Sequence, residues 1–137
     1  MTSVMMSREE LKAACLALLD SMAVEHPAGH QGKLAARYLL RSASGERIGL
    51  MFEKSEETKC CLWVERRFAR DLMDEDIEFR LYLASSLYQT PEDGKKPFYG
   101  RHAALKSMRD LAHADLVRFT LTSSAQMRVI LDHLAKL

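Results

Sequence analysis

Long apolar runs are missing from this sequence. The longest uncharged apolar stretch, residues 13–19, is far shorter than the roughly 20 residues that a membrane-spanning helix needs. The first seven residues are followed at once by Glu9, Glu10 and Lys12, which interrupt any apolar core of a signal peptide. We therefore expect a cytoplasmic protein that is neither secreted nor inserted in a membrane.

Cysteine is scarce and poorly placed for cross-linking. Cys15, Cys60 and Cys61 cannot all pair within one chain, and two adjacent cysteines fit neither a disulfide framework nor a C-x-x-C metal site. We expect reduced thiols in a reducing compartment. Cys15 falls on the apolar stripe of the first predicted helix, where a thiol packs as a small hydrophobic group.

Catalytic and nucleotide-binding signatures are also absent. The chain contains no G-x-S-x-G, no G-x-x-x-x-G-K-[ST] and no G-x-G-x-x-G, which argues against a nucleophile elbow and against the commonest phosphate loops. We expect no cofactor and no metal site, and we favour a non-catalytic protein.

The composition is that of one globular domain. The chain has 137 residues, of which 47% are hydrophobic and 28% are charged, and its net charge is +1. These are ordinary values for a folded chain that is long enough to bury a core. Since no repeat, low-complexity tract or linker divides the chain, we expect residues 1–137 to form a single domain.

Helical signals stand at the two ends. Ser7 with Glu10, and Ser123 with Gln126, have the spacing of a capping box, and each box precedes an apolar stripe of helical period. The stripe residues are Leu11, Cys15, Leu18, Leu19 and Met22 in the first helix and Met127, Ile130, Leu131 and Leu134 in the last.

Strand signals fill the region between them. Residues 34–41 contain Ala and Leu, which also suit a helix, but the turn at residues 42–46 favours a strand that pairs with residues 48–53. Residues 59–65 complete a three-stranded antiparallel meander, in which Trp63 is expected to pack in the core.

Further elements follow the meander. We predict a short helix over residues 66–73, a half-buried strand of period two over 77–83, a loop over 90–97, a short helix over 103–111 and a strand over 116–121. The predicted fold class is α+β: a mostly antiparallel sheet, made of the meander and two further strands, with the N- and C-terminal helices packed on it.

The most chemically loaded segment is residues 94–109. It carries five cations and no acid, a local charge of +5, so the rest of the chain sums to −4. Its cations suit phosphates and its aromatic side chains suit unpaired bases. The candidate binding residues are Lys95, Lys96, Phe98, Tyr99, Arg101, His102, Lys106 and Arg109. A solvated structural loop accounts for the same pattern about as well.

Two binding functions are compatible with this segment. The first, which we favour slightly, is a non-catalytic module that associates with nucleic acid or phosphate. The second is a protein-interaction or adaptor module, in which the basic segment meets an acidic protein surface. That surface could be the acidic run at residues 71–78 of another copy, so a homo-oligomer is included among the expectations.

An enzymatic alternative comes from the order of the elements. A helix followed by three strands resembles the core of the restriction-endonuclease-like nucleases. This resemblance implies an acid near the second strand and an acid-x-Lys triplet in the third, which together hold Mg²⁺ at the cleaved phosphate. Glu53 could be that acid, whereas the nearest triplet, Glu57-Thr58-Lys59, lies in the turn before the third predicted strand. The resemblance covers the element order only.

Histidines offer one more catalytic hypothesis. His102 and His113 flank the predicted helix at 103–111, and Asp110 or Asp115 could orient one of them for proton transfer. Surface histidines of this kind are more often inert or act as caps.

Overall fold

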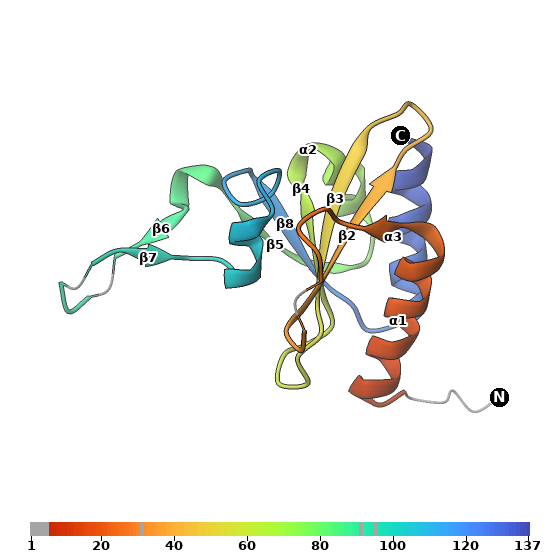
Figure 1. Ribbon diagram of the computed structural model, residues 1–137, viewed down its shortest axis with the longest axis horizontal. Helices are drawn as coiled ribbons and strands as arrows, with labels where there is room; N and C mark the ends of the chain where they lie inside the picture. The colour runs from red at the N-terminus through yellow and green to blue at the C-terminus, as the bar shows by residue number, and fades with distance from the viewer. Residues whose placement is uncertain (1–5, 31, 91, 95) are drawn as a thin grey trace.

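A single six-stranded antiparallel sheet organises the molecule (Figure 1). The computed structural model describes residues 6–30, 32–90, 92–94 and 96–137. The strand order is β1-β2-β3-β4-β8-β5. The bounds are β1 Val24–Glu25, β2 Ala35–Arg41, β3 Arg47–Glu53, β4 Cys61–Glu65, β5 Glu78–Tyr82 and β8 Leu116–Thr120. The predicted α+β class is confirmed.

The meander β2-β3-β4 forms as predicted. Residues 35–41 are a strand and not a helix, and every residue of β2 has a partner in β3, from Ala35 opposite Glu53 to Arg41 opposite Arg47. The third strand begins at Cys61 rather than at Lys59. Trp63 is only 2% exposed, so its predicted place in the core is also confirmed.

Two long helices cover one face of the sheet. They are α1, Arg8–Met22, and α3, Ser124–Lys136, and they lie side by side (Figure 1). Ser7 and Glu10 form the predicted capping box. At α3 the box is only half formed: Ser123 accepts from the Gln126 N–H, but the Gln126 side chain accepts from the N–H of Thr122. No helix among the described residues is both long and apolar enough to cross a bilayer.

The main core lies between these helices and the sheet. Leu19, Ile130 and Leu131 from the helices are fully buried against Leu50 and Phe119 from the sheet. Cys15 belongs to the same core and is completely buried, as predicted. All three cysteines are buried free thiols.

Short elements cover part of the opposite face. The 3-10 helix η3, Ala103–Ser107, and the turns after it place Leu105, Met108 and Leu111 over Met51 and Trp63. The predicted helix at 103–111 is therefore shorter and more tightly wound. The predicted helix at 66–73 forms as α2, Arg66–Ala69, which continues into the 3-10 helix η1, Arg70–Asp74.

The strand predicted at 77–83 forms as β5, but the prediction that it buries one face is wrong. The strand at 77–83 was expected to bury one face, but all of Glu78, Phe79, Arg80 and Leu81 are exposed. The reason is positional: β8 inserts between β4 and β5, so β5 becomes the edge of the sheet.

The prediction of a loop at 90–97 is confirmed for the described residues of that range, and the loop is the tip of a hairpin. After η2, Ala84–Ser86, β6, Tyr88–Gln89, pairs with β7, Phe98–Tyr99. We call residues 88–99 the arm; it projects away from the sheet (Figure 1). Pro91 and Lys95 lie outside the described residues.

Candidate functional site

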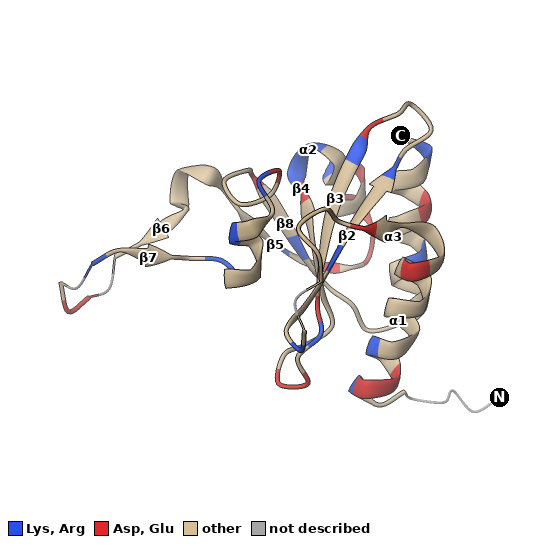
Figure 2. Cartoon of the chain, in the orientation of Figure 1, with Lys and Arg blue, Asp and Glu red and all other residues tan. Residues whose placement is uncertain are grey.

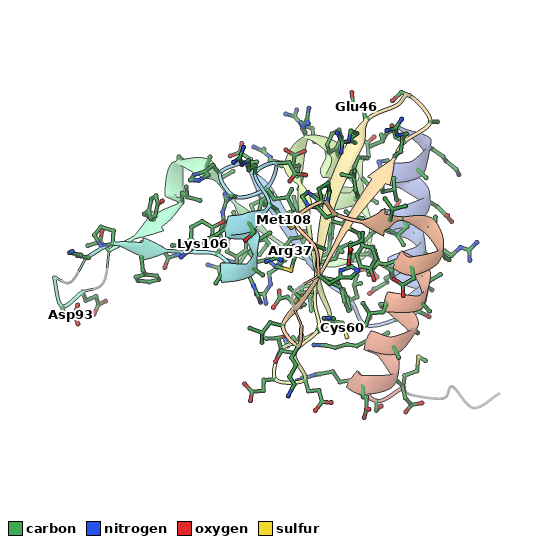
Figure 3. The ribbon with its side chains drawn as sticks, in the orientation of Figure 1. Arg37, Glu46, Cys60, Asp93, Lys106 and Met108 are labelled. Atoms are coloured by element: carbon green, nitrogen blue, oxygen red, sulfur yellow. The ribbon has the colours of Figure 1, made fainter. Side chains whose placement is uncertain are left out.

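The described residues of the basic segment do not form one surface. Its first part belongs to the arm, where Lys96 and Phe98 are exposed, Phe98 by 50%. Figure 2 shows that the end of the arm also carries acidic residues, which are Glu92 and Asp93. Asp93 lies at the far end of the arm, whereas Lys106 lies near its base, on η3 (Figure 3). Lys95 is outside the described residues. The outer arm is thus a region of mixed charge.

Tyr99 and Arg101 point inward and hold the base of the arm. The Tyr99 hydroxyl donates to the carbonyl of Ala112 at 2.8 Å. The Arg101 guanidinium, in a residue only 8% exposed, donates to the carbonyls of Leu111, Ala112 and Tyr82 at 3.2, 3.3 and 2.9 Å. Buried guanidinium groups need such acceptors. These contacts give Arg101 a structural role that its charge in the sequence does not reveal.

His102 and Lys106 also make local contacts. The His102 Nδ1 accepts the N–H of Ala104 at 3.1 Å and so caps η3. Burial of the ring lowers its pKa below the ordinary value. The Lys106 ammonium lies 5.4 Å from the centre of the Tyr99 ring. His113 is exposed, and no hydrogen bond joins it to His102 among the described residues.

Arg109 faces a separate cleft of about 570 Å³. Across this cleft His26 Nε2 lies 3.1 Å from Asp110 Oδ1, and His26 Nδ1 accepts the N–H of Ala28 at 3.0 Å. Since Nδ1 accepts, Nε2 is the nitrogen that donates to Asp110, so both ring nitrogens are engaged. Arg47 lines the same cleft. The guanidinium groups of Arg47 and Arg109 are the groups there that can bind an anion.

A second cavity, of about 220 Å³, lies over the middle of the sheet. At its floor the Glu53 carboxylate accepts from Trp63 Nε1 at 2.9 Å and from Arg118 Nε and Nη2 at 2.8 and 3.1 Å. Burial opposes the charge on Arg118, but the hydrogen bonds and charge of Glu53 outweigh it and raise the pKa of Arg118. This is a buried polar network that the sequence analysis did not find.

The three residues of the nuclease hypothesis differ in their exposure to solvent. Glu53 is 1% exposed and engaged with Trp63 and Arg118, whereas Glu57 and Lys59 are exposed in the turn before β4. Within the described residues, no three His, Cys, Asp or Glu side chains come together as metal ligands.

The surface that the sequence analysis missed is the edge strand β5. β5 pairs with β8 along one side only. Phe79 and Leu81 project on the helical face of the sheet, where Phe79 is 6.5 Å from Phe119 between ring centres, yet they remain 39% and 40% exposed. Leu83, just after the strand, is 37% exposed. The alternating pattern identified the strand, but only the strand order shows that no strand among the described residues pairs with its outer side.

No known protein family matches this chain, and neither does any curated protein or solved structure.

Proposed function

We propose that this protein is a protein-binding module that accepts an additional β-strand along the free edge of β5. The observation that carries this proposal is the distribution of exposed apolar side chains. Nine large hydrophobic residues are exposed among the described residues, and five of them fall within 20 residues of sequence. The five are Phe79, Leu81, Leu83, Tyr88 and Phe98. Three of them, Phe79, Leu81 and Leu83, lie on or directly after β5, and exposed apolar side chains that lie together are typical of interaction sites.

The backbone of β5 supports the same function. An edge strand presents unpaired N–H and C=O groups that can bind another strand. Residues 78–82 contain neither proline nor glycine, so no residue within the strand removes a donor or favours a bulge. The opposite edge of the sheet differs, because β1 has only two residues and Pro27 follows it closely. The two edges are therefore unequal, and β5 is the longer one.

The side chains of β5 would supply selectivity. Phe79 and Leu81 project on one face, and Glu78 and Arg80 project on the other. Directly opposed side chains of paired strands share a face of the sheet. A strand that binds here would therefore place apolar residues opposite Phe79 and Leu81 and charged residues opposite Glu78 and Arg80. The arm, which follows β5 in the chain, exposes two further aromatic side chains, Tyr88 and Phe98.

A peptide-display selection tests this proposal. We expect selected peptides to alternate apolar and charged residues and to bind wild-type protein but not Leu81→Lys. Val129→Lys is the matched control, because Val129 on α3 is 44% exposed and Leu81 is 40% exposed. Peptides that bind Leu81→Lys and wild-type protein equally well would refute the β5 site.

Association with phosphate or nucleic acid is a second candidate, supported by the cleft at Arg109. Arg41 and Arg47 lie directly opposite each other in the β2–β3 pair, where like charges repel. Arg47 and Arg109 both line the cleft, and a bound phosphate would offset this repulsion. This surface shares only Arg109 with the binding residues predicted from the sequence.

Salt-dependent binding of a labelled single-stranded oligonucleotide tests the second candidate. Each phosphate contact that is lost should reduce the salt dependence by close to one unit. Arg47→Glu/Arg109→Glu should abolish binding, while Lys96→Glu on the arm serves as the control for the outer basic segment. Binding that survives the double substitution but not Lys96→Glu would move the site to the arm.

A further inference from the structure

We infer that the strand that pairs with β5 comes from a second copy of this chain, with the two β5 strands antiparallel about a two-fold axis at Phe79. This inference rests on the proposed function and identifies the partner. The two sheets would join into one of twelve strands, since each contributes six. A self-complementary surface of this kind is what a two-fold dimer requires.

The charges of β5 select this register. An axis at Phe79 places Glu78 opposite Arg80 of the partner subunit, and the symmetry repeats the pair. Both side chains are available for this pair: among the described residues neither Glu78 nor Arg80 forms an ion pair, and the Arg80 guanidinium lies 4.9 Å from the centre of the Tyr82 ring. Opposite charges across an antiparallel pair stabilise it, and like charges destabilise it.

Neighbouring registers are less favourable. An axis at Arg80 places two arginines directly opposite each other, which is repulsive. An axis at Leu81 places Arg80 opposite Tyr82 of the partner subunit and leaves Glu78 facing Ala84, so no acid meets a base. Registers shifted by half a residue would put apolar side chains of the two copies on opposite faces of the sheet.

The same axis also places the apolar side chains of β5 opposite apolar side chains of the partner subunit. Phe79 would stand opposite Phe79 of the partner subunit, and Leu81 opposite Ile77. Aromatic pairs across neighbouring strands contribute to sheet stability. Phe79 and Leu81, which are 39% and 40% exposed in the single chain, would lose that exposure to water, and this is the main source of affinity.

The small area of the interface limits the affinity of the dimer. A stable interface usually buries about 800 Å² on each partner, and β5 provides only five residues. We therefore expect association that is concentration-dependent, with monomers at low micromolar concentration and dimers near the millimolar range. A small edge-to-edge contact of this kind is also sensitive to a single reversed charge.

Sedimentation velocity over a concentration series, using the full chain, tests the inference. Glu78→Arg and Arg80→Glu each turn two attractive pairs into repulsive ones, so each should weaken the dimer about tenfold or more. The double variant Glu78→Arg/Arg80→Glu restores opposite charges and should recover the wild-type constant. Glu57→Arg, in the exposed turn before β4, is the matched control for a reversed charge elsewhere.

Each outcome has a defined meaning. If the single variants weaken the dimer and the double variant restores it, the register is established. Single variants that leave association unchanged, or a double variant that fails to restore it, would overturn the inference. A chain that stays monomeric at every concentration would also overturn it. In that last case, peptides that still bind wild-type protein but not Leu81→Lys would leave the proposed function standing. Far-ultraviolet circular dichroism of each variant confirms that the comparison is between folded chains.

Discussion

Glu53 on β3 and Arg118 on β8 form a two-point ion pair across the intervening strand β4. Their atoms lie 2.8 Å apart at Nε–Oε2 and 3.1 Å apart at Nη2–Oε1, and the same carboxylate accepts from Trp63 on β4. Glu53 and Arg118 are 65 positions apart in sequence. One buried acid therefore ties together three strands that pair only through β4.

Removing this acid should destabilise the fold strongly. Glu53→Ala leaves Arg118 and Trp63 without their acceptor, and breaking a buried pair in this way typically costs about 3–5 kcal/mol. Glu53→Gln keeps one carbonyl acceptor and should cost about 1–3 kcal/mol. Urea unfolding measures both, and Glu57→Ala on the exposed turn should change the unfolding free energy by less than about 0.5 kcal/mol. Equal effects of Glu53→Ala and Glu57→Ala would contradict the role of the ion pair.

Substitution of Gly49 by a larger residue should destabilise the fold because of Asp110. A Cβ at Gly49 would overlap Asp110 Oδ2, which belongs to the carboxylate that pairs with His26. Gly49→Ala should therefore cost about 1–3 kcal/mol, as overpacking usually does. In an Asp110→Ala background the overlapping atoms are gone, so Gly49→Ala should cost much less there. A double-mutant cycle from thermal or urea unfolding measures this difference, and purely additive effects would argue against the contact.

Stability should fall as the pH is lowered through the titration range of His102. Burial lowers the folded-state pKa of His102 below its ordinary value of 6.5. Between those two pKa values the unfolded chain binds the extra proton, so acid favours unfolding. The contribution of His102 is fully present above about pH 6.5 and is lost progressively below it.

His102→Asn isolates this contribution. The amide oxygen of Asn can accept the Ala104 N–H that His102 now accepts, but Asn does not titrate. Unfolding free energies measured from neutral to mildly acidic pH should fall less steeply for the variant than for the wild type. The raised pKa of Glu65 acts in the opposite direction at lower pH, and it cancels in the comparison because both proteins contain Glu65. Parallel pH profiles would rule out a contribution from His102.

Local sequence patterns predicted the elements well. The Ser7–Glu10 capping box and the helical stripes located α1 and α3, because both signals depend on residues within a few positions of each other. The turn at 42–46 likewise identified the β2–β3 hairpin. These features depend on interactions between residues that are close in sequence, so a single sequence is enough to predict them.

Long-range pairing was not predictable in the same way. The alternation around Phe79 and Leu81 indicates a strand. It does not indicate whether β8 pairs between β4 and β5 or beyond β5 in the sheet. The insertion of β8 makes β5 an edge and leaves its apolar side chains exposed. The surface that we propose as the binding site is therefore a consequence of strand order.

Charge in the sequence was also ambiguous. Arg101 reads as a free cation, yet backbone carbonyls far along the chain surround it. Glu53 reads as a candidate metal-holding acid, yet it is buried and paired with Arg118. A guanidinium or carboxylate can be solvated or satisfied inside the protein, and only the tertiary contacts decide which.

Hydrogen exchange at the backbone amides of residues 78–82, followed over a series of protein concentrations, tests most directly whether the outer edge of β5 accepts a further strand. We predict that exchange in β5 slows as concentration rises, while exchange in β8, residues 116–120, stays constant as an internal reference. The slowing should disappear in Glu78→Arg and return in Glu78→Arg/Arg80→Glu. Exchange in β5 that is the same at every concentration and in every variant would contradict the account.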